Sequence, residues 1–395
     1  MRKPLGGSLA LCLLLACLLN ACATGATQNT PGCTTLDTQG VVSATLPLPG
    51  QPFQALSTFN NQWIFVSVIS KNAASNGIAV FQQQDAQICL KRLIPLTGTP
   101  MGLTLTQKDD LLLVADYNGI AILDAQQAEQ GVQGALLGYV REPGMSSTVR
   151  VGISPDEHYA FAATEKEGTL SLLDFQRIRA DDFNPDVLLG QLSPGAGLSD
   201  LAVALDNRYL YVTVGAQSAT ATSQSNCATQ GSLELLDLQR ITQNAAHIVI
   251  AKVAAGCDPG RVYLSADNST AWVTTRGDNK IFAFNTLTLS SAPKNALLAS
   301  STVGPVSLGM GIVQNGSLLL VANSNCYAEP HKTQTLSVFD IRKVIQGQPA
   351  VLTTVHVGAC PREVTVESDD QTVLLTDFNS NALTVINAAK LPIPK

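Results

Sequence analysis

Four charged residues recur at one place in the sequence, directly before a short apolar stretch: Arg150, Asp200, Arg261 and Glu363. An arginine guanidinium binds a carboxylate or phosphate through paired hydrogen bonds. A carboxylate beside it can serve as a general acid or base. The same four groups can instead neutralise one another. The sequence therefore leaves two interpretations open, a polar ligand-binding site and a plug of ion pairs.

Further polar residues occur in loops that could overhang such a site. These loop candidates are Arg276, Tyr327, Glu329 and His331. No serine, histidine and aspartate have a local arrangement that supports a catalytic triad, so we name no catalytic residue.

The nine cysteines are the other residues with distinctive chemistry. None stands in a Cys-x-x-Cys pair or a Cys/His cluster of the kind that binds zinc or attaches haem, so we expect no metal and no cofactor. Six lie downstream of Cys22, an even number that suits three disulfides in an oxidising compartment. These six are Cys33, Cys89, Cys227, Cys257, Cys326 and Cys360.

The place of the four charges follows from an internal repeat. Each copy has an apolar stretch, a turn with Asp or Asn, a second apolar stretch, a polar loop, and a third stretch that ends in Asp or Asn. The centres of the second stretches are 48, 48, 50, 61, 48 and 54 residues apart: Val66, Val114, Ala162, Val212, Val273, Val321 and Leu375. In six copies an apolar residue stands eleven positions earlier, whereas the copy around Met310 looks less regular. The residues directly before these positions are Gln54, Gly102, Arg150, Asp200, Arg261, Gly309 and Glu363.

The stretches have the length and composition of β-strands. A fourth strand, such as residues 88–94, precedes each following copy. Four antiparallel strands at a period near 48 are typical of a propeller blade. The sequence predicts an all-β fold, a seven-bladed β-propeller of four-stranded antiparallel blades, with the charged column at the mouth of the axial channel.

The two ends of the repeat array predict how the ring closes. The apolar stretch 41–48 belongs to no copy, and the seventh copy has only a third strand, 383–387, before the last residues. We expect the N-terminal strand to complete the last blade. Residues 41–395 then form a single domain, and residues 22–40, which are small and polar, form a flexible tether.

Residues 1–21 are typical of an export signal, because Arg2 and Lys3 precede an apolar run of about fifteen residues and then small residues. The run is shorter than the ~20 residues of a membrane span. Leu19-Asn20-Ala21-Cys22 resembles the bacterial lipobox, which implies a lipid on Cys22. Lipidation at Cys17, and an ordinary cleaved signal with a soluble product, are the alternatives. Ala23 after the lipidated cysteine favours the outer membrane, facing the periplasm.

The expected ring also predicts disulfides. In antiparallel blades the loop between the second and third strands lies on the same face as the link to the next blade. Cys227 and Cys257 occupy these two places in blade 4, and Cys326 and Cys360 occupy them in blade 6. We predict these two pairs. Cys33–Cys89 follows by elimination and would hold the tether near blade 1.

Leu210-Tyr211-Val212-Thr213 resembles the second-strand motif that names the YVTN family of β-propellers. Trp272-Val273-Thr274 and Leu320-Val321-Ala322-Asn323 are variants of it, and the resemblance covers about residues 41–390. It implies a propeller architecture. Relatives include surface-layer and periplasmic repeat proteins and lactonases that open 6-phosphogluconolactone. No lactonase catalytic motif can be placed on this chain residue by residue, so the resemblance leaves activity open.

Charge narrows the classes of partner. Without residues 1–21 the chain has 22 basic and 30 acidic residues, a net charge of about −8. Nucleic acid is thereby excluded, since it requires a basic surface. We expect an exported, monomeric propeller that is held to the membrane by its lipid anchor only. Its expected function is that of a binding or protein-interaction scaffold, and its partner is an envelope protein, a glycan or a small ligand. A lactonase-like hydrolase with a site at the channel mouth, and a subunit of a periplasmic redox or envelope-assembly machine, are the alternatives.

Overall fold

The computed structural model describes residues 32–71, 75–141, 145–180, 182–215, 230–241, 248–326 and 331–394. Gly32–Lys395 form one compact unit. Among the described residues, no helix is long and apolar enough to cross a membrane. The predicted export signal of residues 1–21 lies outside the described ranges, and so do four predicted site residues: Cys22, Cys227, Tyr327 and Glu329.

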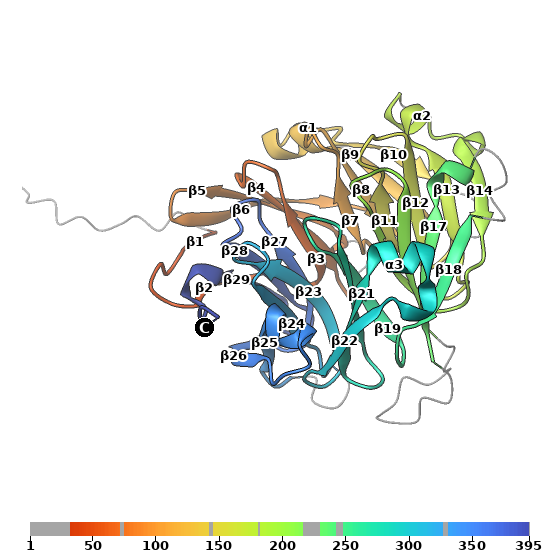
Figure 1. Cartoon of the computed structure of the whole chain (residues 1–395). Helices are drawn as coiled ribbons and strands as arrows, with labels where there is room; N and C mark the ends of the chain where they lie inside the picture. The colour runs from red at the N-terminus through yellow and green to blue at the C-terminus, as the bar shows by residue number, and fades with distance from the viewer. Residues whose placement is uncertain are drawn as a thin grey trace, which may run out of the picture. The chain divides into compact units, whose positions relative to one another are not determined.

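Seven antiparallel sheets make up the fold, one for each blade (Figure 1). Blade 1 contains β3 (Gln51–Ser57), β4 (Trp63–Ile69), β5 (Gly77–Gln84) and β6 (Gln87–Pro95), and blade 2 contains β7 (Leu103–Leu105), β8 (Leu111–Ala115), β9 (Ile120–Asp124) and β10 (Leu136–Val140). Blade 3 contains β11 (Thr148–Ile153), β12 (Tyr159–Thr164), β13 (Leu170–Asp174) and β14 (Leu188–Leu192), and blade 4 contains β15 (Leu198–Val203), β16 (Tyr209–Val214), β17 (Ser232–Asp237) and β18 (Val249–Ala254). Blade 5 contains β19 (Pro259–Leu264), β20 (Thr270–Thr275), β21 (Lys280–Asn285) and β22 (Leu297–Thr302), and blade 6 contains β23 (Ser307–Val313), β24 (Leu318–Asn323), β25 (Gln334–Asp340) and β26 (Val351–Val357). Blade 7 contains β27 (Pro361–Val366), β28 (Thr372–Asp377), β29 (Ala382–Asn387) and β2 (Val42–Pro47).

The first strands of the blades form a closed inner ring. Each contacts the first strand of the next blade, in the order β3, β7, β11, β15, β19, β23 and β27, and β27 returns to β3. We call the face that carries the links between blades and the loops between second and third strands the upper face. The lower face carries the turns between first and second strands and the connections between third and fourth strands. The seven-bladed, all-β prediction is therefore confirmed.

The constant offset of eleven residues in the repeat is the register of the first two strands. The residues at this offset are direct cross-strand partners in all seven blades: Ala55 and Val66, Leu103 and Val114, Val151 and Ala162, Leu201 and Val212, Val262 and Val273, Met310 and Val321, and Val364 and Leu375. Met310 thus lies in the common register, although its copy looks irregular in sequence. Because side chains alternate along a strand, this register directs the same columns to the same side in every blade.

The N-terminal strand closes the ring as predicted. β2 pairs with β29 and so supplies the fourth strand of blade 7. The preceding segment differs from the predicted tether of residues 22–40, because β1 (Cys33–Thr35) adds a fifth strand to blade 1 beside β6. Cys33 lies opposite Cys89 there. Strand pairing and a covalent bond therefore order the end of that segment.

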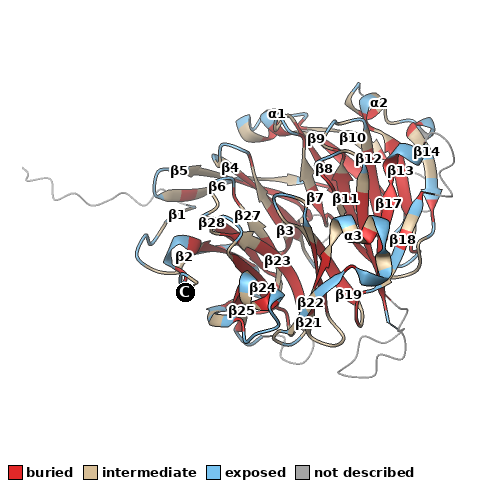
Figure 2. Ribbon diagram, viewed as in Figure 1, coloured by how far each residue is buried: buried red, intermediate tan, exposed pale blue. Residues whose placement is uncertain are grey.

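Buried apolar side chains fill the seams between blades. Seven clusters each draw residues from two neighbouring blades, and together they account for all seven seams. Figure 2 shows the buried residues along the strands and the exposed residues mostly on outer strands, turns and short helices. A blade is thus buried on both sides only because the ring is closed.

The Asp or Asn that ends the third strand has a structural role. In four blades its side chain accepts a backbone N–H and caps a short helix on the lower face. The capping residues are Asp124, Asp174, Asn285 and Asp340, and the helices are α1 (Ala125–Gln130), α2 (Phe175–Arg179), α3 (Thr286–Ser291) and α4 (Ile341–Ile345). These residue types are the preferred helix N-caps, which explains their place in the repeat.

Candidate functional site

In three blades, a hydroxyl group on the second strand positions the residue of the column. The Thr376 hydroxyl accepts the backbone N–H of Glu363 at 3.0 Å and donates to the carbonyl of Phe53 in the next blade at 3.0 Å. Thr274 does the same for Arg261 and Leu308, at 3.1 and 2.7 Å. Ser67 also makes the equivalent pair of contacts, with Gln54 and Met101. In these three blades, the residue that follows the centre of the second strand therefore ties the column to both blades of a seam.

The structure brings the four predicted charges together in one contiguous group, which we call the mouth cluster: Arg150, Asp200, Arg261 and Glu363. Arg150 contacts Asp200 at 2.8 Å through Nε and Glu363 at 2.5 Å through Nη2. Arg261 binds the same Glu363 carboxylate, with Nε 2.9 Å from Oε1 and 3.1 Å from Oε2. No member of the cluster is more than 7% exposed. The charges are thus buried and mutually paired.

Uncharged members of the column complete the packing. The Gln54 side-chain oxygen accepts from Arg150 Nη1 and from the backbone N–H of Leu103, both at 2.9 Å. Gly102 and Gly309 stand where neighbouring blades approach too closely for a side chain. A Cβ on Gly309 would lie 2.4 Å from the carbonyl oxygen of Arg362. The column therefore combines ion pairs with two positions of close backbone contact.

The surroundings shift the pKa values of the two carboxyl groups in opposite directions. Burial disfavours the charge on Glu363, but Arg150 and Arg261 outweigh it and lower the pKa of this group to about 2. Burial raises the pKa of Asp200 above its usual range in spite of the same two arginines. Both Asp200 oxygens are engaged, because Oδ1 contacts Arg150 and Oδ2 accepts the backbone N–H of Val262 at 3.0 Å. At neutral pH Glu363 is a counter-ion and not a base.

Of the loop candidates, Arg276 reaches over the mouth. It extends from blade 5 to bind Asp258 at 2.9 Å and Glu165 of blade 3 at 3.3 Å. His331 is exposed in the loop of blade 6. No hydrogen bond or ion pair among the described residues joins His331 to the mouth cluster.

Arg362 belongs to this mouth but was missed by the sequence reasoning. Its guanidinium carbon lies 4.2 Å from the ring centre of Phe53 and 5.3 Å from that of Phe378. Burial, together with the charges of Arg261 and Arg150, lowers the pKa of Arg362 to about 10. It stands one position before the charged column, where the other blades carry Phe53, Met101, Val149, Ser199, Gly260 and Leu308. Arg362 is the one charged residue at this position of the repeat, and that difference could have identified it from the sequence.

Disulfides hold the upper face and the N-terminal strand. The structure joins Cys33 to Cys89 and Cys326 to Cys360, two of the predicted pairs. Cys257 is also disulfide-bonded, and the predicted partner Cys227 lies outside the described residues. The Cys326–Cys360 bond ties the long loop of blade 6 to the link that leads directly to Arg362. No group of three or more metal-binding side chains occurs in the part of the chain that the structure describes.

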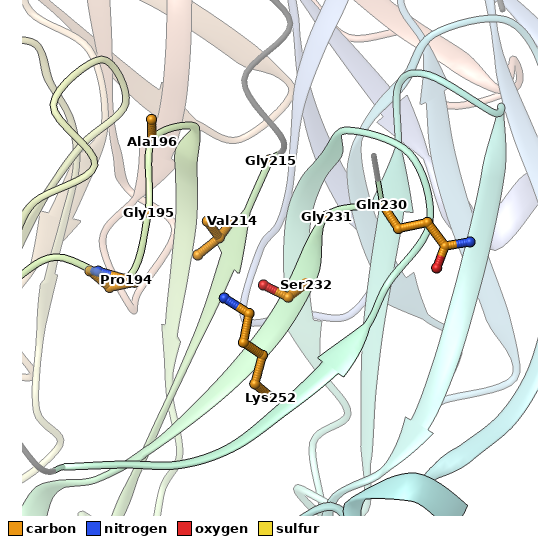
Figure 3. Close-up of a pocket in the computed structure, with 9 residues that line it drawn as sticks. All are labelled: Pro194, Gly195, Ala196, Val214, Gly215, Gln230, Gly231, Ser232 and Lys252. Carbon is orange, nitrogen blue, oxygen red and sulfur yellow. The ribbon is translucent and has the colours of Figure 1, made fainter. Parts of the chain in front are cut away.

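A hollow of about 430 Å³ lies at the upper end of blade 4 (Figure 3). Its lining residues are Pro194, Gly195, Ala196, Val214, Gly215, Gln230, Gly231, Ser232 and Lys252. Lys252 is its one cation among these residues, and its Nζ already lies 2.6 Å from Oε1 of the buried Glu234. The hollow is therefore lined by both small apolar and polar residues, and its one cation is already paired.

Comparison with known proteins supports the architecture. No protein-family model matches the chain, and no curated protein sequence does. The chain has the fold of known β-propellers. Hydrazine synthase of Kuenenia stuttgartiensis is similar at a TM-score of 0.66 and 14% identity, covering 92% of this chain and 99% of that chain.

Two further solved structures show the same likeness. The β-propeller domain of Myceliophteria thermophila Cps50 (Swd1) has a TM-score of 0.60 and 11% identity, over 87% of this chain and 99% of that chain. A chain of the mitotic checkpoint complex has a TM-score of 0.65 and 10% identity, over 93% of this chain and 99% of that chain. At these identities the likeness shows the fold alone.

Proposed function

We propose that this chain is an exported, lipid-anchored β-propeller of the YVTN kind, which acts as a binding or protein-interaction scaffold in the cell envelope. The export signal of residues 1–21 and the lipobox-like Leu19–Cys22 support an anchor on Cys22 in the outer membrane, facing the periplasm. The Cys33–Cys89 and Cys326–Cys360 disulfides suit the oxidising compartment that export implies.

The mutual pairing in the mouth cluster carries the proposal of a scaffold. A general base needs a carboxylate oxygen that is free to accept a substrate proton. Glu363 gives its oxygens to Arg150 and Arg261, and Asp200 gives its oxygens to Arg150 and a backbone N–H. Such a network makes a rigid centre on which the upper loops are presented. Loops held by a rigid framework are a common means of recognition in proteins.

The alternative is a lactonase-like hydrolase, and one observation favours it: burial raises the pKa of Asp200. A pKa raised by burial is common in carboxyl groups that act as general acids or bases. Asp200→Asn separates the two functions. A hydrolase would lose its lactone-opening rate in this variant, whereas a scaffold would keep its partner as long as circular dichroism shows the fold intact.

The anchor is tested by labelling cells with radioactive palmitate and separating membranes from soluble protein. We expect label on the wild type and on Cys17→Ser, and none on Cys22→Ser. Label that stays on Cys22→Ser, or a wild type found only in the soluble fraction, would contradict the proposed anchor.

The scaffold role is tested by crosslinking in intact cells and purification from membranes. We expect a partner that is crosslinked by the wild type and lost when the upper loop 324–333 is replaced by a short Gly/Ser linker. The matched control replaces the lower-face turn 205–208 and should keep that partner. Equal crosslinking in the two variants would refute recognition by the upper face.

A further inference from the structure

We propose that the upper mouth of the ring binds a carboxylate group of its ligand on Arg362. This inference rests on the proposed binding role of the upper face and is independent of the lipid anchor. Arg362 makes no hydrogen bond or ion pair with the described residues, and its Nε is buried without a hydrogen-bond partner. A partly buried cation that forms no ion pair is unfavourable unless another group compensates it.

The carboxylates of the mouth are already bound by other arginines. Asp200 is held by Arg150, and Glu363 is shared between Arg150 and Arg261. At the rim of the mouth, Arg276 forms ion pairs with Asp258 and Glu165. The mouth and rim together hold equal numbers of arginines and carboxylates, but the pairing is uneven. Arg276 has two carboxylates, whereas Arg362 has none.

Aromatic rings hold the guanidinium of Arg362 and leave its N–H groups available. The guanidinium lies over Phe53 and near Phe378, and Arg150 lies over the same Phe53 ring at 5.3 Å. Stacking uses the face of a guanidinium, whereas its N–H groups point outward from the edge and match the two oxygens of a carboxylate. Arg362 is half-buried, so a ligand can reach it from the upper face.

The chemistry of the neighbours favours a carboxylate over a phosphate. Arg150 and Arg261 both select carboxylates within the same mouth. Arg362 offers one positive charge that forms no ion pair with a described carboxylate, and a single carboxylate of a ligand can pair with it. That carboxylate can belong to a free organic acid or to an acidic side chain of a protein partner. The binding chemistry is the same, and the two sources are separated by experiment.

The test uses the full chain in micelles of a non-ionic detergent and isothermal titration calorimetry at low ionic strength. The probes are succinate, a tri-glutamate peptide and inorganic phosphate. We expect Arg362→Gln to weaken carboxylate binding about ten-fold or more, since it removes a charge-assisted pair. Arg208→Gln is the matched control, because Arg208 also stacks on an aromatic ring, Tyr209 at 4.8 Å, but on the lower face. The Arg208→Gln variant should bind the carboxylate probes as tightly as the wild type does. Added salt should weaken that binding in the wild type and in Arg208→Gln.

Each outcome decides the proposal. Binding of both carboxylate probes supports it with a free acid as a sufficient ligand, and binding of tri-glutamate alone supports it with an acidic peptide as the source. Three outcomes overturn the proposal: the wild type binds neither carboxylate probe, Arg362→Gln binds the carboxylate probes as tightly as the wild type does, or the wild type binds phosphate more tightly than the carboxylate probes. If Arg362→Gln does not fold, Arg362→Lys decides, because it keeps the charge and loses the paired donors; unchanged affinity there overturns the paired contact.

The failure of this inference can be told from failure of the scaffold role. A crosslinked partner captured equally by the wild type and by a folded Arg362→Gln would refute carboxylate binding on Arg362 and leave the scaffold intact. Loss of that partner in Arg362→Gln, together with weaker tri-glutamate binding, supports both.

Discussion

A buried glutamate at the seam that closes the ring should make the stability of this protein fall as the pH rises. Glu367 directly follows the first strand of blade 7, is 3% exposed, and neither of its carboxyl oxygens has a hydrogen-bond partner among the described residues. Neighbouring residues pack on blade 1, since Thr365 donates to the carbonyl of Ala55 at 2.6 Å and Ser368 to that of Phe59 at 2.7 Å. Ionisation of Glu367 therefore places a charge in the closing seam.

The size of the effect follows from the pKa. Burial, and then the charge of Asp369, raise the pKa of Glu367 from 4.5 to about 8. The folded state thus holds this proton more tightly than the unfolded state does. The stabilisation of the folded state by this bound proton is complete below about pH 4.5 and is lost as the pH rises through about 8. At pH 7 the loss amounts to about 3 kcal/mol, and it approaches about 5 kcal/mol above pH 8.

Glu367→Gln tests this reasoning, because the amide keeps the shape of the protonated acid and cannot ionise. Urea unfolding of wild type and variant at pH 5, 7 and 8.5 should give a free-energy difference that grows with pH in favour of the variant. Asp206→Asn, which removes an exposed carboxylate from the corresponding turn of blade 4, is the control and should show no such trend. A difference that is the same at pH 5 and 8.5, or a variant less stable than the wild type at pH 8.5, would refute the reasoning.

Three other substitutions test the ring and its mouth by urea unfolding. Glu363→Gln leaves two arginines buried without their shared counter-ion and should lower the free energy of unfolding by about 3–5 kcal/mol; a loss below 1 kcal/mol would count against the ion-pair network. Gly309→Ala should cost about 1–3 kcal/mol because of the carbonyl 2.4 Å from its Cβ, whereas Gly260→Ala, with 3.5 Å of space, should be tolerated; equal costs would contradict the packing. Cys326→Ser opens a bond that closes a 34-residue separation and should cost about 2–4 kcal/mol, but only when the wild type is compared under non-reducing conditions.

Much of the fold could be predicted because one short pattern is repeated. The eleven-residue offset between first and second strands is local in the chain, and each copy reports the same register. The Asp or Asn at the end of the third strand is local too, because it caps the backbone that follows it. Local geometry of this kind is readable from residue types and spacing.

Other features needed the folded ring. The sequence left the charged column open between a ligand site and a plug, because Arg150 and Glu363 are 213 residues apart and meet only across the mouth. The strand at Cys33–Thr35 was missed since three polar residues have no periodic pattern to detect. Arg362 was missed because its column is apolar or small in the other blades, and its stacking on Phe53 joins the two ends of the array.

The sequence by itself therefore determined the number of blades, the pairing within each blade, the closing strand and the equivalent places of cysteines and charges. All of these depend on contacts between residues close together in one copy, or on counting copies. The tertiary structure decided which charges pair, which arginine lacks a carboxylate, and where a glutamate is buried in the closing seam. Those outcomes depend on how seven copies converge around one axis, where side chains from distant copies compete for the same few partners.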